Sequence, residues 1–307
     1  MAIISIVFPL IFMATLGYFL TNKSIFSKEQ ISGISLFTFY LSIPAFLFIN
    51  MFQADLSKSF DITALACFYL PVVTAHGVGV GLYCFLRKGQ SQRLAHGSAY
   101  GLACSYSNTI LVGLPIIVGA LGQEMMGTVF IIITFHSALL FSLTFILALR
   151  GEEAGFKYWP FVKGIMFNPI VMSISLGLLL NILHIPLFDN LANGINLLSQ
   201  PALACALFVL GANLSFYKVA KDWKLALLAT FVKLIVLPTF VYALGSLFML
   251  EQQLLAVLVL LSASPLGINA YLVAVQVKAQ QAVIASTVVL STVLCVFTMS
   301  LWLSILL

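Results

Sequence analysis

The sequence predicts an all-α integral membrane protein with ten transmembrane helices in two inverted five-helix repeats. Three observations lead to this fold class: the composition, the placement of the basic residues, and two interruptions inside apolar segments. The chain of 307 residues is 62% hydrophobic and only 7% charged, with a mean hydropathy of +1.13. Soluble domains carry roughly 25% charged residues. Nearly all of the chain is therefore expected in the bilayer, which argues against a large cytoplasmic enzyme or a nucleic-acid-binding module.

Charged residues and short stretches rich in Pro and Gly divide the chain into ten apolar segments. A spanning helix needs about 20 residues, and each segment is long enough. Period-2 alternation is missing, so barrel strands are not expected. The expected spans are 3–20, 31–52, 62–86, 95–121, 127–149, 162–183, 190–213, 225–249, 253–276 and 280–306.

The basic residues predict the orientation of these spans. In a ten-span arrangement, twelve of the 14 Lys and Arg residues fall on the loops of one side, only Lys58 falls on the other, and Lys233 lies within a span. The positive-inside rule then makes the loops after odd-numbered spans cytoplasmic. We therefore expect a multi-pass protein of the cytoplasmic (inner) membrane, with both termini outside.

The two halves of the chain share a pattern of residues. Pro44 and Pro201 are 157 positions apart, and the same shift relates Ser105 to Ser262. The longest loop, 150–161, separates a first five-helix repeat at 1–150 from a second at 151–307. Because five is odd, the second copy enters the membrane from the opposite side, which defines an inverted repeat.

Two predicted spans are interrupted near their middle. Span four reads Ser-Tyr-Ser-Asn-Thr-Ile-Leu-Val-Gly-Leu-Pro over residues 105–115, and span nine reads Ser-Ala-Ser-Pro-Leu-Gly-Ile-Asn over 262–269. Unpaired backbone groups are costly in lipid, so such breaks are tolerated only where protein or a cavity shields them. Paired breaks in corresponding positions indicate the substrate site of a secondary transporter.

The inverted repeat would bring the two breaks together as crossing helices. Half-helix N-termini carry partial positive charge and backbone N–H donors, which favour an anion such as a carboxylate. A kink with structural hydrogen bonds is the alternative interpretation. The candidate substrate-binding residues are Ser105, Asn108, Thr109, Gly113, Pro115, Ser264, Pro265, Asn269 and Lys233.

Buried titratable groups refine this expectation. Lys233 is either a counter-charge for an anionic substrate or a structural donor that bonds helix-end carbonyls or snorkels to the interface. His76 and His136 lie in spans three and five, and either can carry a proton or serve as an interhelical hydrogen-bond partner. No Asp or Glu lies inside a predicted span, so a deep carboxylate proton relay is not expected.

The five cysteines lie in apolar segments at unrelated spacings. This pattern fits neither a disulfide framework nor a metal site. We expect no metal, no cofactor and no nucleic-acid partner. The partners expected are the lipid bilayer, a small organic anion and a coupling ion, either a proton or sodium.

The chain resembles the auxin efflux carrier family over its whole length. The most specific motifs are Asn108-Thr109 followed after three residues by Gly113-Leu114-Pro115, and Ser264-Pro265-Leu266-Gly267-Ile268-Asn269. A third motif, Lys-Leu-Ile-Val-Leu-Pro at 233–238, looks like the family's eighth span. The chain lacks the long hydrophilic loop of the longer plant carriers, so it resembles the short bacterial form.

The resemblance implies a scaffold of helices 1, 2, 6 and 7 and a transport domain of helices 3–5 and 8–10. It also implies an elevator-like movement and a homodimer. Bacterial members are associated with malate, malonate and other small carboxylates, and plant members with the auxin anion.

The sequence therefore predicts a non-enzymatic membrane transporter for a small organic anion, a mono- or dicarboxylate such as malate or malonate or an auxin-like acid. The substrate is expected at the crossing of helices four and nine. One alternative is a sodium-coupled symporter of larger organic anions on the related bile-acid-transporter architecture. More distant alternatives are an intramembrane hydrolase, for which no recognisable motif is found, and a non-transporting sensor.

Overall fold

The computed structural model describes residues 2–54, 61–89, 92–122, 125–149, 167–216 and 222–307. The loop expected at 150–161 lies outside the described residues. The described chain is helical, and contact clustering divides it into two compact units. Unit 1 covers 1–61, 114–134 and 157–216, and unit 2 covers 62–113, 135–156 and 217–307, apart from the undescribed residues in each.

Unit 1 holds the first three helices and the helices that follow the central loop. It also contains one short helix and the beginning of a long one, α7. These helices are α1 (Ala2–Asn22), α2 (Lys28–Phe37), α3 (Ile43–Gln53), α6 (Leu114–Leu121), the start of α7 (Met126–Leu149), α9 (Pro169–Ile182), α10 (Asp189–Ser199) and α11 (Ala202–Leu214).

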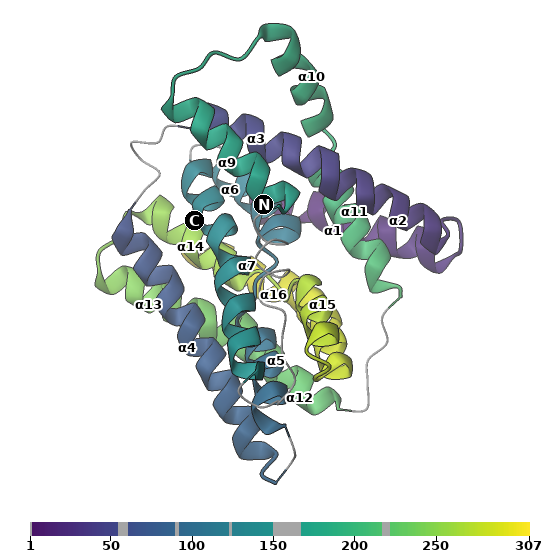
Figure 1. Ribbon diagram of the computed structural model, residues 1–307, viewed down its shortest axis with the longest axis vertical. Coiled ribbons are helices and arrows are strands. Elements are labelled where there is room, and N and C mark those ends of the chain that lie inside the picture. Colours follow the sequence, from purple (N-terminus) through teal and green to yellow (C-terminus); the bar gives the residue numbers. More distant parts are fainter. Residues whose placement is uncertain (1, 55–60, 90–91, 123–124, 150–166, 217–221) are drawn as a thin grey trace. The chain divides into compact units, whose positions relative to one another are not determined.

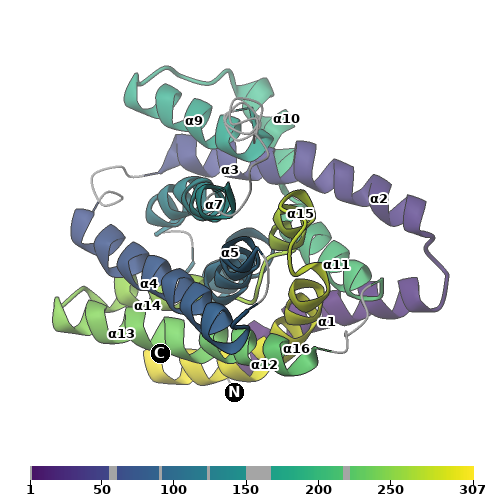
Figure 2. The ribbon, with the colours of Figure 1, turned by 60° about the horizontal axis from the view of Figure 1, so that its bottom comes forward.

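Small residues allow two helix pairs in unit 1 to pack closely. Helix α1 lies along α11, and α3 lies along α9 (Figures 1 and 2). A Cβ on Gly17 would collide with the Phe208 carbonyl, and one on Gly211 would collide with the Ala14 backbone. In the second pair, a Cβ on Gly177 would lie 2.6 Å from the Phe48 carbonyl oxygen. Close backbone approach at small residues is a typical packing mode of membrane helices.

Unit 2 holds the two interrupted helices and the long helices around them. Its helices are α4 (Ile62–Leu86), α5 (Arg93–Ser105), the rest of α7, α12 (Trp223–Phe231), α13 (Leu237–Leu247), α14 (Gln252–Ala263), α15 (Asn269–Gln276) and α16 (Gln281–Leu306). Helices α4 and α5 lie side by side, as do α12 and α16 (Figures 1 and 2). Gly101 on α5 makes the first approach possible, because a Cβ there would lie 2.6 Å from the His76 carbonyl oxygen of α4.

Three π-helical turns each precede a proline. The turns are Thr38–Ser42, Thr109–Gly113 and Val232–Val236. Pro44, Pro115 and Pro238 follow as the second residue of α3, α6 and α13. A proline lacks the N–H and clashes with the carbonyl four residues earlier, which in each case lies in the widened turn. The sequence prediction of a break near Pro115 is therefore refined: this proline starts a new helix after a π turn.

Six described helices are long and apolar enough to cross a membrane, and four shorter ones are apolar as well. The long ones are Lys28–Gln53, Ile62–Leu86, Met126–Ala148, Asp189–Leu214, Trp223–Leu247 and Gln281–Leu306. The protein is thus an all-helical, multi-pass membrane protein. The count of ten spans and the inverted repeat remain predictions.

Packing at Gly211 should be essential to unit 1. Replacing Gly by Ala normally favours a helix by roughly 1 kcal/mol, but overpacking costs about 1–3 kcal/mol. We expect Gly211→Ala to lower the thermal unfolding midpoint of the detergent-solubilised protein by several degrees. Gly194→Ala is the control, because a Cβ there would meet nothing within 4 Å. An unchanged midpoint in Gly211→Ala would contradict the close packing of α1 on α11.

Candidate functional site

The first break follows α5 in unit 2. Tyr106 leaves the helical conformation, with φ −75° and ψ 122°, and helical structure resumes only with the π turn at Thr109. Ser105 is the last residue of α5 and is fully buried. The interruption expected from the sequence is confirmed, and its extended part is the short segment 106–108.

The second break follows α14 in the same unit. Helix α14 ends at Ala263, and Ser264 is extended with φ −60° and ψ 143°. Helix α15 begins at Asn269. Pro265 lies within this break, where its missing N–H removes no helical hydrogen bond.

The two extended segments pair with each other. Ser107 and Leu266 form an isolated antiparallel β-bridge, and the Asn108 N–H donates to the Pro265 carbonyl at 2.7 Å. Glycine is needed where they touch: a Cβ on Gly267 would lie 2.6 Å from the Tyr106 ring. Each break thus provides hydrogen-bond partners for backbone groups of the other, so the two breaks form one structural element.

Side chains of the long neighbouring helices satisfy two further backbone groups of the breaks. The Ser107 N–H donates to Nε2 of His136 on α7, at 2.9 Å. The Leu266 N–H donates to the hydroxyl of Ser291 on α16, at 3.0 Å. Because a buried N–H without a partner costs about 1–3 kcal/mol, these side chains stabilise the extended conformation.

The helix end that precedes each break contacts a basic side chain. Nδ1 of His76 lies 3.3 Å from the Ser105 hydroxyl. Nζ of Lys233 donates to the Ser262 carbonyl at 2.5 Å. Each basic residue is 29 positions before its serine, and the 157-residue shift relates both members of the two pairs. Lys233 is fully buried, so the snorkelling interpretation is wrong, and its contact is with a helix-end carbonyl.

Asn108 has a donor that the described residues leave unused. Its Oδ1 accepts the Leu111 N–H at 3.1 Å and so caps the following turn. Its Nδ2 is buried and has no hydrogen-bond partner among the described residues. The same holds for Nδ1 of His136, which carries the proton of the neutral ring because Nε2 accepts from Ser107. Two buried N–H donors without acceptors therefore adjoin the first break.

Unit 2 brings together most of the residues expected from the sequence. Ser105, Asn108, Thr109, Gly113, Ser264, Pro265 and Lys233 are buried at or beside the two breaks. A Cβ on Gly113 would lie 2.9 Å from the Ser264 hydroxyl. Asn269 is an exposed residue whose side chain bonds Tyr106. Pro115 is the second residue of α6, which is assigned to unit 1, and its role in the site stays a prediction.

Sequence reasoning missed three contributions. Tyr106 packs its ring on His136, with centroids 5.2 Å apart, and its hydroxyl lies 3.0 Å from Ser137. Ser291 gives no sequence signal, because serines that bond their own helix are common along α16. His136 was recognised as a buried polar residue, but its partner is set by tertiary packing.

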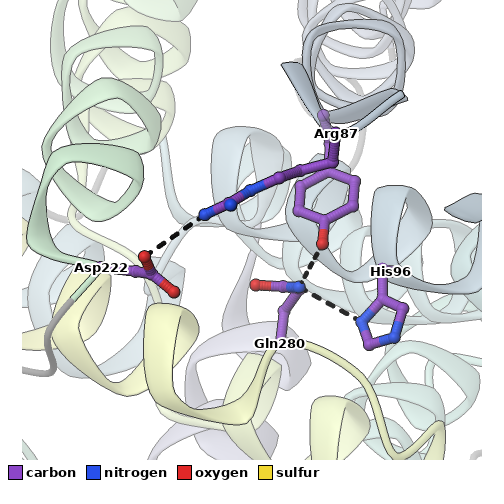
Figure 3. A network of polar contacts seen from close by, with 5 residues as sticks. Arg87, His96, Asp222 and Gln280 are labelled. Atoms are coloured by element: carbon purple, nitrogen blue, oxygen red, sulfur yellow. Dashed lines mark hydrogen bonds and ion pairs between the residues drawn. The ribbon is translucent and has the colours of Figure 1, made fainter. Parts of the chain in front are cut away.

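A second polar cluster joins other segments of unit 2. Nε2 of Gln280 donates to the Tyr83 hydroxyl at 2.6 Å and lies 3.2 Å from Nδ1 of His96. Arg87 pairs with Asp222 at 3.3 Å (Figure 3). Gln280 has a left-handed φ of 51° and immediately precedes α16. This cluster fixes helix ends and includes none of the predicted site residues.

An all-helical membrane protein with two interrupted, mutually bonded helices fits the class of membrane transporters. The family model described as "Membrane transport protein" matches residues 2–159 and 160–303. The chain therefore belongs to this family of membrane transporters, the auxin efflux carrier family. The resemblance inferred from the sequence motifs is confirmed.

Two curated relatives cover nearly the whole chain. An "Uncharacterized transporter" of Methanothermobacter thermautotrophicus is 23% identical over 300 residues, which are 96% of each chain. A "Putative malonate transporter" of Rhizobium meliloti is 24% identical over 311 residues, covering 97% of this chain and 94% of the relative.

The Ser291 hydroxyl should stabilise the second break. We expect Ser291→Ala to destabilise the protein by about 1–3 kcal/mol, because the Leu266 N–H loses its acceptor. Hydrogen exchange at the Leu266 amide should accelerate. The control is Ser300→Ala on the same helix, where the hydroxyl bonds only its own turn, at Val296. Equal exchange at Leu266 in both variants would contradict this role of Ser291.

Proposed function

We propose that this protein is a secondary transporter that moves a small organic anion across the cytoplasmic membrane by alternating access. The substrate is a mono- or dicarboxylate such as malate or malonate, or an auxin-like acid, and it binds at the paired breaks of unit 2. The observation that carries this proposal is the buried, unused N–H donor of Asn108 in a protein of a transporter family.

The donors at the breaks suit a carboxylate. An ionised carboxylate only accepts hydrogen bonds, and it can take one from each of several N–H groups. Asn108 and His136 both offer such a group. A buried donor without an acceptor is unfavourable, so a ligand that supplies the acceptor gains this free energy on binding.

The charge of the site also favours an anion. Lys233 is fully buried, and its Ser262 partner is a neutral carbonyl. None of the described helices α5, α13, α14 and α16 carries an Asp or Glu between its first and last residue. A charge at membrane depth is costly unless it is paired. A substrate carboxylate is the counter-charge that this part of the protein lacks.

The limited space between the breaks supports a small substrate. Gly113 faces Ser264 and Gly267 faces the Tyr106 ring, and neither has room for a Cβ. A relative that carries malonate in its name agrees with a compact dicarboxylate. Malonate is therefore the first substrate to test.

We further propose the ten-span, five-plus-five inverted repeat, in which helices four and nine cross at the breaks. Two features support it. The segments at Ser107 and Leu266 run antiparallel, and the pairs His76–Ser105 and Lys233–Ser262 have equal spacing. Both are expected when two similar halves enter the membrane from opposite sides.

The domain organisation belongs to the same proposal. Helices 1, 2, 6 and 7 would form the scaffold of a homodimer, and helices 3–5 and 8–10 the transport domain of an elevator-type carrier. The grouping of α1–α3 with α9–α11 and of α4, α5 and α12–α16 in separate units supports this division, whereas α6 and the start of α7 group with the proposed scaffold. Both termini would face outward.

Sodium-coupled transport is the alternative, and Lys233 argues against it. Helix-end carbonyls are the oxygen ligands that coordinate sodium in broken-helix transporters. Here the Ser262 carbonyl at the end of α14 already accepts from the Lys233 ammonium. The Lys233 ammonium therefore lies at the carbonyl where a sodium ion would be expected.

The donor of Asn108 should be required for transport. Asn108→Asp keeps the oxygen that caps Leu111, but it replaces the Nδ2 donor with a negative charge. We expect malonate uptake into proteoliposomes to fall at least about 100-fold, the scale of a lost hydrogen bond plus charge repulsion, while thermal stability changes little. Asn50→Asp is the control, because Asn50 donates only to its own helix, at Phe46. Undiminished uptake in Asn108→Asp would remove the site assignment.

Uptake should not require sodium. We expect the same initial rate of malonate uptake when sodium is replaced by choline on both sides of the vesicle, because Lys233 supplies the cation at the end of α14. A sodium gradient that drives accumulation would favour the bile-acid-transporter type of mechanism instead.

A further inference from the structure

The two buried histidines of unit 2 have different nitrogen atoms left unused. His76 is 0% and His136 is 1% exposed, and both contact the first break. Nε2 of His76 and Nδ1 of His136 have no hydrogen-bond partner among the described residues. The bonds made by the other ring nitrogen decide what each unused atom can do.

His136 is held as a neutral ring. Its Nε2 accepts the Ser107 N–H at 2.9 Å, so this atom presents a lone pair and the proton is on Nδ1. A second proton on Nε2 would face the Ser107 N–H, donor against donor. Ser107 would then lose its acceptor inside the bridge to Leu266. Protonation of His136 would therefore disrupt the first break.

His76 can take a proton without breaking a bond. When the Ser105 hydroxyl donates its single proton to the Gly101 carbonyl at 2.9 Å, it accepts from Nδ1 of His76, 3.3 Å away. The proton of the neutral His76 ring is thus on Nδ1. Its Nε2 carries a buried lone pair. A proton added to Nε2 leaves both existing hydrogen bonds in place.

The titratable side chains around His76 can be named helix by helix. On the described segments that pack against α4, the titratable side chains include Tyr100 and Cys104 of α5, Lys233 of the π turn, His136 of α7 and Tyr242 of α13. His96 and Arg93 lie at the far end of α5, and on α4 itself the titratable groups are Cys67, Tyr69, Tyr83 and Cys84.

None of these groups is a carboxylate. The acids nearest in sequence, Asp61 and Glu251, precede α4 and α14. At 1.5 Å per helical residue they lie about 22 Å and about 16 Å along the helix from His76 and Ser262. Among the described residues, an imidazolium at His76 therefore has no counter-charge of opposite sign on the helices packed against α4, and a buried charge needs one. The anion that binds at the break is the group that would supply it.

We propose that His76 is the proton-coupling residue of this carrier. A proton from water on one side binds Nε2 when the anion binds, and it is released to water on the other side when the anion leaves. His136 stays neutral throughout. By linkage, the anion raises the proton affinity of His76 by the same factor as the proton raises the affinity for the anion. This inference rests on the proposed function as an anion carrier.

A dicarboxylate makes the coupling most favourable. Lys233 offers one positive charge, which leaves one negative charge of a dianion uncompensated. One proton on His76 brings the loaded site to neutrality. We therefore expect one proton to accompany each malonate.

The experiment compares wild type, His76→Gln and His96→Gln in proteoliposomes, with radiolabelled malonate and an internal pH-sensitive dye. His96 is the control, because it contacts Gln280 near the start of α5, at the other end of that helix from the first break. A glutamine at 76 can still donate to Ser105 but cannot take up a proton. We expect uptake by wild type and His96→Gln to rise up to about tenfold per pH unit on acidification, the limit for one proton, with acidification of the lumen. His76→Gln should lose both the pH dependence and the proton flux. Protonation of malonate itself affects the assay equally for all three proteins, so it does not account for a difference between them.

Proton coupling that persists in His76→Gln, or disappears in His96→Gln, would overturn the assignment. If wild type moves malonate without protons, the proposed function stands and the role of His76 fails. If no carboxylate is transported, nitrogen-15 NMR of histidine-labelled protein still tests the inference. We expect His76 to gain its proton at a higher pH than His136, and the reverse order would contradict it.

Discussion

The structure depends on one constraint: backbone groups released by a helix break inside apolar surroundings must find partners. Each break of unit 2 releases N–H and carbonyl groups where lipid offers none. The two breaks solve this together, through the bridge between Ser107 and Leu266. His136 and Ser291 satisfy the two bridge residues from α7 and α16. The same arrangement leaves Nδ2 of Asn108 without a hydrogen-bond partner among the described residues, so the donor proposed to bind the ligand lies in the stretch of chain that forms the bridge.

Two basic side chains complete this arrangement by contacting the helix end before each break, His76 from α4 and Lys233 from the π turn at 232–236. Carbonyls at a helix C-terminus carry partial negative charge. Lys233 meets this charge directly at Ser262, whereas His76 bonds the hydroxyl of Ser105. The two positions 157 residues apart therefore carry different chemistry: one holds a lysine that bonds a helix-end carbonyl, and the other holds a histidine with an unused ring nitrogen. In the proposed mechanism, this difference would couple the anion to a proton.

Much of this arrangement is predictable from the sequence. Ser, Pro, Gly and Asn inside apolar segments indicate the breaks, and the 157-residue shift indicates that they are related. Local chemistry explains this success, because proline and glycine act on their own turn. The π turns before Pro44, Pro115 and Pro238 follow from the same local effect, although the sequence predicted an interruption only near Pro115 and did not predict its π geometry.

Contacts between distant segments were beyond sequence reasoning. Nothing in the surroundings of Ser291 distinguishes it from the other serines of α16, and its role is set by the approach of Leu266. From the sequence, Lys233 was at a depth from which its ammonium could still reach the membrane interface. In the structure, the turn at 232–236 packs against α14, and the side chain is buried there instead. Pro115 was expected at the site because a proline interrupts its helix; it lies on α6 in unit 1, so its role at the site stays a prediction.

The central claim is that the paired breaks bind the substrate anion. A cryo-electron microscopy structure with malonate bound tests it most directly. The account predicts a carboxylate at the first break, with an oxygen within about 3.2 Å of Nδ2 of Asn108, the usual limit for such a hydrogen bond. Malonate bound away from both breaks, with the Asn108 amide bonded to protein instead, would contradict it.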